Sequence, residues 1–156
     1  MYEYQETDGI QTCVFTSTVG ELAERVSEET SYLSATIRTD EGVPLVDDYA
    51  VTEDEYDIIT DYIKESARRI SSAEFAKLSR RPHDFDGDNV IFRAEAKEEA
   101  EGTEDEVDEG IKTLIAMTAT FKWLSTKGLD KFLQTYAVRI AEAEQTLHRA
   151  MFGFRM

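Results

Sequence analysis

Hydrophobic and polar positions alternate at the start of the chain, which predicts a β-hairpin over residues 1–16. Two short strands flank Asp8-Gly9, a dipeptide that favours the tight turn of a two-residue hairpin. Because an isolated hairpin is marginal in water, we expect this one to lie on helices or to join another subunit. The turn makes one face aromatic by pairing Tyr4 with Cys13 and Tyr2 with Phe15.

Three later segments begin with the same Thr-x-x-Glu pattern, in which the threonine oxygen and the glutamate carboxylate cap the first turn of a helix reciprocally. The three patterns are Thr18 to Glu21, Thr52 to Glu55 and Thr103 to Glu106. At the second, we expect Val51 to pack against Tyr56 across the first turn. The sequence therefore indicates three separate helix starts.

Apolar residues recur at helical spacing after each start, and again after Asp130. The expected helices are 19–37, 53–78, 103–127 and 130–153, with Pro82 beyond the second and Gly128 and Gly153 ending the last two. Their expected core anchors are Val19, Leu22, Val26, Leu33 and Ile37; Tyr56, Ile59, Ile63, Ile70 and Leu78; Val107, Ile111, Leu114, Ile115, Thr118, Phe121, Trp123 and Leu124; and Leu133, Tyr136, Ile140, Leu147 and Met151.

The connections complete the prediction of one mainly α domain over 1–156, a four-helix bundle with an N-terminal β-hairpin and a short strand between helices two and three. The last two helices should form an antiparallel hairpin at the centre of the bundle, because only about three residues join them. Residues 39–50 read as a loop, 89–96 as the strand and 97–105 as a solvated segment. The expected parts are a hairpin arm (1–16), two helices (17–81), an acidic loop and strand (82–105) and a helical hairpin (106–153).

Charge is unevenly distributed along the chain. The 156 residues have a net charge of −16, yet residues 111–156 carry 3 acids and 7 bases, whereas 83–110 carry 12 acids and 2 bases. Such an acidic chain is repelled by DNA and anionic lipid, so we expect no direct nucleic-acid contact and no membrane contact. No apolar run approaches the ~20 residues of a membrane span. The basic C-terminal third could meet an acidic partner, although ordinary solubility charge is also a sufficient explanation.

No motif for catalysis stands out, and we expect no enzyme activity, no catalytic residue, no metal and no cofactor. His83 and His148 have neither metal-ligand nor nucleophile–base spacing, and there is no phosphate-binding glycine loop. The single Cys13 excludes an internal disulfide, and a chain without a signal-like start suits a reducing compartment.

One acidic segment, residues 84–95, resembles the calcium loop of the EF-hand family. Asp84, Asp86, Asp88 and Glu95 match its oxygen-ligand positions 1, 3, 5 and 12, and Ile91 matches the hydrophobic position 8. Asn89 stands where that loop requires a left-handed turn and nearly always has glycine. The competing interpretation is a turn that leads into a strand, with the acids exposed.

Aromatic residues at both ends of the chain are candidates for protein contacts, because interfaces are rich in aromatic residues and arginine. The C-terminal residues could equally fold back on the helices. The candidate interface residues are Tyr2, Tyr4, Phe15, Phe152, Phe154 and Arg155.

The order of elements over 18–156 resembles that of small virion proteins of tailed phages. The features that carry the resemblance are two capped helices, the second with Tyr62-Ile63 and Ala67-Arg68-Arg69; a strand; a long helix ending in Phe121-Lys-Trp123-Leu124; a glycine break; and a last helix with Tyr136-Ala137 and Ala141-Glu-Ala143-Glu before a basic tail. The plan is similar to that of head–tail connectors, which are helical, form rings and sit below the portal.

The resemblance implies a non-enzymatic structural protein of the virion, made in the cytoplasm of a bacterial host. Its expected partners are copies of itself and other virion proteins such as portal or tail components. Two alternatives remain open at this point. The first is an acidic binding or inhibitor protein that imitates the charge of nucleic acid, and the second is a calcium-binding protein that uses residues 84–95.

Overall fold

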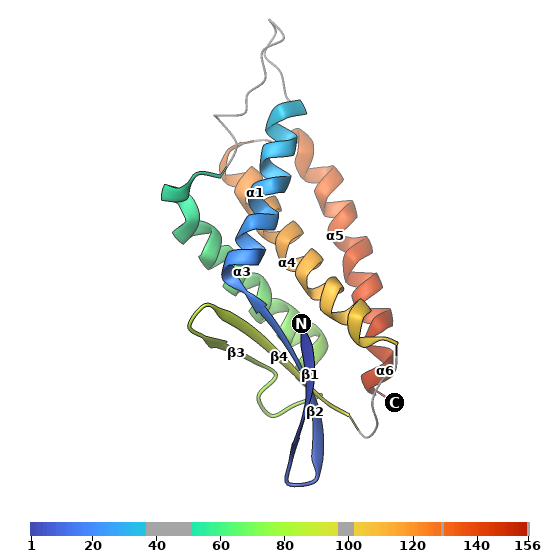
Figure 1. Ribbon diagram of the computed structural model, residues 1–156. Helices are drawn as coiled ribbons and strands as arrows, with labels where there is room; N and C mark the ends of the chain where they lie inside the picture. Colours follow the sequence, from blue (N-terminus) through green and yellow to red (C-terminus); the bar gives the residue numbers. More distant parts are fainter. Residues whose placement is uncertain (37–50, 97–101, 129, 156) are drawn as a thin grey trace, which may run out of the picture.

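The computed structural model describes residues 1–36, 51–96, 102–128 and 130–155, with the side chains of 33–36, 130, 131 and 155 left aside. It is mainly helical, with an N-terminal antiparallel hairpin, as expected (Figure 1). The elements are β1 (Tyr2–Thr7), β2 (Ile10–Thr18), α1 (Val19–Thr36), η1 (Glu53–Glu55), α3 (Tyr56–Ile70), η2 (Ser71–Phe75), β3 (His83–Asp86), β4 (Asn89–Ala96), α4 (Glu104–Thr126), α5 (Asp130–Ala150) and α6 (Phe152–Arg155).

The N-terminal hairpin forms in the predicted register, with Tyr4 opposite Cys13 and Tyr2 opposite Phe15. Asp8 and Gly9 both adopt positive φ (54° and 77°), as the predicted tight turn requires. The hairpin is not an isolated arm, because β2 also pairs with β4 along eight positions. The four strands form one antiparallel sheet in the order β1-β2-β4-β3.

β3 is an element that the sequence analysis missed. Residues 84–95 form a β-hairpin over Gly87 (φ 58°), in which Asp86 lies opposite Asn89. The interpretation of this segment as a turn that leads into a strand is therefore confirmed. Asp84 accepts a hydrogen bond from Arg81 over 2.8 Å.

The helix starts are formed in three different ways. Thr18 and Glu21 form the predicted reciprocal box, with the Thr18 amide donating to the Glu21 carboxylate (2.9 Å) and the Glu21 amide donating to Thr18 Oγ1 (3.1 Å). The second box, between Thr52 and Glu55, opens the short η1 turn. At Thr103 the backbone is already helical (φ −103°, ψ −16°), which is not the extended geometry of such a cap.

The second predicted helix ends earlier than expected. α3 stops at Ile70 and continues as one π-helical turn, η2, whose Phe75 is fully buried. Leu78 lies beyond the helix, where its carbonyl accepts from the Glu95 amide of β4 (2.8 Å). Tyr56, expected as a core anchor, is 41% exposed and therefore lies outside the core.

The core lies between the sheet and the helices, with α4 at its centre. α4 contacts α1, α3, α5 and β1, and its residues Ile111, Leu114, Ile115 and Trp123 are buried. An aromatic cluster joins the sheet to η2 and α6: the Phe75 ring lies 5.1 Å from Phe92 and 6.2 Å from Phe15, and Phe154 lies 5.9 Å from Phe15.

α5 packs antiparallel to α4, as predicted, but it lies at the edge of the molecule and not at the centre (Figure 1). Leu133 and Ile140 are consequently only half-buried, because α4 is the main neighbour of α5. α5 ends at Ala150, and Gly153, the expected helix end, lies within α6. Ile37, the loop 39–50 and residues 97–101 of the predicted solvated segment lie outside the described residues. Within the described part, no helix is long and apolar enough to cross a membrane.

Candidate functional site

The candidate interface residues do not gather on one surface. Phe15 and Phe154 are 1% and 6% exposed and pack on each other in the core, which corrects the expectation that they are available for a partner. Tyr2 and Tyr4 are half-buried against the same core. Phe152 is half-exposed and lies edge-on to His148, and the side chain of Arg155 is outside the described part. The C-terminal segment thus folds back onto the core at Phe154, whereas the side chain of Phe152 is half-exposed.

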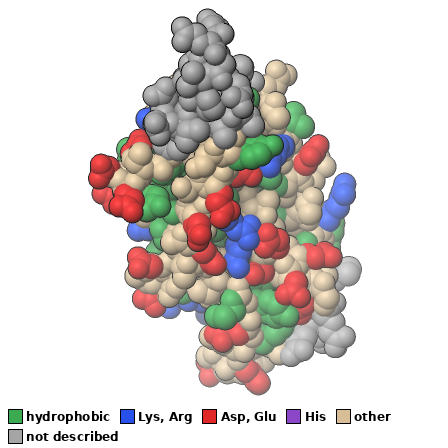
Figure 2. Space-filling view, turned by 45° about the horizontal axis from the view of Figure 1, so that its top comes forward, with side chains coloured by type: hydrophobic (Ala, Val, Ile, Leu, Met, Phe, Trp, Pro, Cys, Tyr) green, Lys and Arg blue, Asp and Glu red, His purple; other side chains and the backbone are tan. Residues whose placement is uncertain are grey.

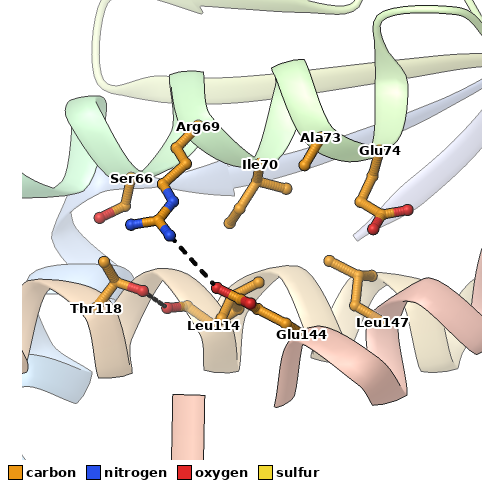
Figure 3. Close-up of a pocket in the computed structure, with 9 residues that line it drawn as sticks. All are labelled: Ser66, Arg69, Ile70, Ala73, Glu74, Leu114, Thr118, Glu144 and Leu147. Atoms are coloured by element: carbon orange, nitrogen blue, oxygen red, sulfur yellow. Dashed lines mark hydrogen bonds and ion pairs between the residues drawn. The ribbon is translucent and has the colours of Figure 1, made fainter. Parts of the chain in front are cut away.

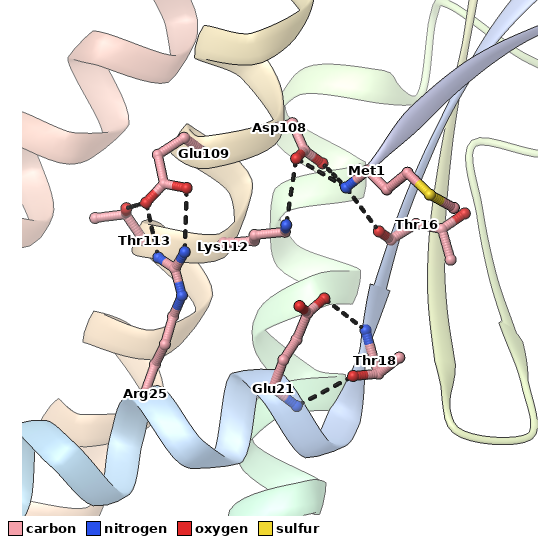
Figure 4. Close-up of polar contacts among 9 residues, drawn as sticks. All are labelled: Met1, Thr16, Thr18, Glu21, Arg25, Asp108, Glu109, Lys112 and Thr113. Carbon is pink, nitrogen blue, oxygen red and sulfur yellow. Dashed lines mark hydrogen bonds and ion pairs between the residues drawn. The ribbon is translucent and has the colours of Figure 1, made fainter.

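Polar contacts connect the start of the chain to α4 (Figure 4). The Met1 amine lies 2.8 Å from the Asp108 carboxylate and also donates to the Thr16 carbonyl over 3.2 Å. Lys112 approaches the same carboxylate at 3.3 Å. Tyr4 donates to Glu104, which is only 5% exposed although the sequence placed it in a solvated segment. These contacts hold β1 against α4 and so serve the fold.

Two groups with potential chemistry, Ser71 and Cys13, are buried. His83 Nδ1 lies 2.7 Å from the Ser71 hydroxyl, a pairing that the sequence analysis did not foresee, but Ser71 is only 1% exposed, so a substrate has no access to it. Burial raises the pKa of the fully buried Cys13 thiol to about 12, which keeps it protonated and unreactive. Among the described residues, no three His, Cys, Asp or Glu side chains converge as metal ligands.

A small cavity of about 160 Å³ lies between α3, α4 and α5 (Figure 3). Its walls include Ile70, Leu114 and Leu147, and the ion pair between Arg69 and Glu144 spans it at 3.9 Å. The Ser66 hydroxyl is buried at this cavity and forms no hydrogen bond within the described residues. The cavity holds no nucleophile with an adjacent base, and its size suits ordered water.

The larger opening in the surface is a groove over α4 between α1 and α5, which we name the α4 groove. It consists of two adjoining hollows of about 660 and 580 Å³ that share Glu109, Thr113, Met117 and Arg139. The remaining lining residues are Arg25, Glu28, Glu29, Tyr32, Ala116 and Tyr136 in the first hollow, and Asp105, Glu106, Gly110, Glu142, Ala143 and Thr146 in the second.

Three helices position the walls of the α4 groove. Arg25 of α1 forms two hydrogen bonds to Glu109 of α4 (2.9 and 3.1 Å), which hold the pKa of that carboxyl below its usual range. On the other side, Tyr136 of α5 donates to Glu29 of α1 over 2.6 Å. Burial, followed by this hydrogen bond, raises the pKa of Tyr136 above its usual value. Arg139 also reaches Glu29, at 3.5 Å.

The α4 groove is acidic. Six carboxylates and two arginines line it, and both arginines are already paired. The rim carboxylates that form no ion pair with any described residue are those of Glu28, Asp105, Glu106 and Glu142. Acidic side chains also outnumber basic ones on the face shown in Figure 2, with apolar side chains between them. The charge of the α4 groove therefore suits it to binding a positively charged partner.

Sequence reasoning missed the α4 groove because its floor is the polar side of a helix that otherwise faces the core. The sequence signal for it was Gly110. A Cβ added at this position would lie 3.3 Å from Leu147 Cδ1, so glycine allows α4 and α5 to pack closely. Comparisons with protein-family models, with curated proteins and with solved structures found no match to this chain.

Proposed function

We propose that this protein is a non-enzymatic structural component that acts through contacts with other proteins, as a head–tail connector or tail-assembly component of a tailed-phage virion. The observation that carries this proposal is the α4 groove. In this groove Thr113 and Met117 of the central helix are only partly covered by α1 and α5. Ser71 and the Cys13 thiol, by contrast, are buried.

The order of the helices supports a head–tail connector among the possible kinds of protein-binding protein. The four long helices α1, α3, α4 and α5 form, in this proposal, a four-helix bundle around α4, the plan that the resemblance to connectors implies. The protein would act as a homo-oligomer, together with portal or tail proteins, in the virion after synthesis in the host cytoplasm. The apolar side chain of Phe152, which is 50% exposed, offers surface for these contacts.

The proposal is tested by mixing the purified protein with portal and tail proteins from the same phage, and analysing the mixtures by sedimentation and electron microscopy. We expect a ring-shaped assembly that forms with a virion partner, and a weaker assembly for Phe152→Glu than for the control Gln145→Glu, which adds the same charge on exposed α5 surface. A protein that stays monomeric alone and with every virion component would contradict the proposal. Portal and capsid genes beside the gene for this protein would support it.

A second function, an acidic binding or inhibitor protein, is favoured by the same groove and by the net charge of −16. Such a protein would imitate the charge of nucleic acid toward a basic DNA-binding protein. Affinity capture from a host lysate, washed at increasing salt, distinguishes the two. Recovery of a DNA-binding protein, displaced by added DNA, would favour the inhibitor, whereas recovery of virion proteins alone would exclude it.

A further inference from the structure

We propose that the α4 groove binds a basic amphipathic helix of a partner protein, an inference that rests on the proposed action through protein contacts. α4 has α1, α3 and α5 as helical neighbours, and the sector between α1 and α5 carries the groove. A fourth helix placed there would lie over α4, beside the contacts that join Glu29 of α1 to Tyr136 and Arg139 of α5. This arrangement is the helix-in-groove mode of recognition.

The floor of the groove has the length and shape for a helix. Glu106, Gly110, Thr113 and Met117 follow one another at spacings of three or four residues, so they form a track along α4. This track spans about 16 Å, or three helical turns, at 1.5 Å per residue. The small side chain of Thr113 on this track allows a helix axis to approach closely, whereas Gly110 is already packed against Leu147 of α5.

The side chains of the groove indicate which residue types a bound helix would carry. Met117 and Ala143 offer an apolar strip, and a flexible methionine adapts to different apolar side chains. On the rim, Glu106 and Glu142 form no ion pair with any described residue. An entering helix would therefore place apolar residues at i, i+3, i+4 and i+7 on this strip, with lysine or arginine on both flanks.

Other occupants fit the groove less well. Nucleic acid is repelled by the acidic rim. A β-strand would need exposed backbone groups, but the walls are helices whose backbone groups are already paired within each helix. A second copy of this chain has the same net charge of −16, so the two copies repel each other as a whole.

The test uses a designed helical peptide of about 18 residues, with leucine on one face and lysine on its flanks. Its control is a scrambled peptide with the same composition and no apolar face. Binding is measured by fluorescence anisotropy at low and high salt. Methyl NMR adds a position-specific readout, because Met117 lines the groove whereas Met151 is fully buried elsewhere in the core.

We expect the amphipathic peptide to bind, more weakly at high salt, and to shift the Met117 methyl signal while leaving Met151 unchanged. Met117→Arg should weaken binding at least about tenfold, as the loss of a central contact does. The matched control Val138→Arg places the same charge on the outer face of α5 and should bind like the wild type.

The proposal is overturned if the scrambled peptide binds equally well, or if Met117→Arg and Val138→Arg bind alike. It is also overturned if the protein alone is an oligomer that Met117→Arg dissociates, since a second copy would then occupy the groove. Peptide binding tests this inference and virion assembly tests the proposed function, so either one can fail without the other. Assembly without peptide binding would remove this inference and leave the proposed function, and peptide binding without assembly would do the reverse.

Discussion

The Tyr4 hydroxyl donates a hydrogen bond over 2.8 Å to the carboxylate of Glu104, which joins the first strand to the first turn of α4. Glu104 is only 5% exposed, in contrast to its neighbours Asp105 and Glu106, which are exposed. The Met1 amine makes a second link between the same two elements through Asp108. The N-terminal strand is thereby attached to the central helix and to β2.

Loss of the Glu104 carboxylate should therefore destabilise the protein. Glu104→Ala removes the acceptor of Tyr4 and leaves a space at the start of α4, at an expected cost of about 1–3 kcal/mol in the free energy of unfolding. Glu106→Ala is the matched control, because it lies in the same helical turn but is exposed, and it should cost less than about 0.5 kcal/mol. Urea denaturation measures both. Equal, small losses would restore the interpretation of this segment as solvated.

Leu114 tests the position of the core on α4. Leu114→Ala should lower the free energy of unfolding by about 2–5 kcal/mol, because the removed atoms leave a cavity among buried neighbours. Val138→Ala, on the exposed side of α5, should change it by less than about 0.5 kcal/mol. The side chains of Leu114 and Val138 are 4% and 55% exposed. An unchanged denaturation midpoint for Leu114→Ala would mean that the core lies elsewhere.

Ser66 is a site where a polar group can be removed with benefit. Its hydroxyl is buried beside the small cavity without a hydrogen bond to the described residues, so Ser66→Ala should leave stability unchanged or raise it by about 0.5–1 kcal/mol. Ser72→Ala, at an exposed position in the next turn, controls for the better helix propensity of alanine. A clear loss of stability at Ser66 alone would show that an ordered water in the cavity satisfies the hydroxyl.

Cys13 should make the protein less stable at alkaline pH. Its folded-state pKa is raised to about 12, mainly by burial, whereas a thiol in the unfolded chain ionises near pH 8.5. The folded state therefore holds its proton more tightly, and this contribution is complete below about pH 8.5 and is lost as the pH rises toward 12.

The measurement compares urea denaturation of the wild type and Cys13→Ala at pH 7.5 and 9.5. The wild type should lose about 1.4 kcal/mol more than the variant over this interval, because lysines and tyrosines titrate in both proteins and cancel in the comparison. Equal losses would show that the thiol is accessible. Thiol-specific reagents offer an independent check, since Cys13 should react only after unfolding.

Local structure followed from local pattern. The Asp8-Gly9 turn and the Thr18–Glu21 cap formed as predicted, because both depend on residues within a few positions of one another. The apolar stripe of α4 was also predicted for the same reason, apart from Phe121, which is only half-buried. The π-helical turn at Ser71–Phe75 was not predicted, because Phe75 reaches its position against Phe92 through a contact with a distant strand.

The sequence by itself determined the mainly helical class, the N-terminal hairpin and its register, and most of the helix starts, since capping, turn chemistry and apolar periodicity act over short separations. Tertiary structure alone decided that β2 pairs with β4, that Glu104 is buried and that α5 lies at the edge of the molecule. It also decided the α4 groove. The groove lies where α1 and α5 both contact α4 and are joined by side chains, here Glu29 and Tyr136. Its form depends on packing angles and partners that no single helical stripe contains.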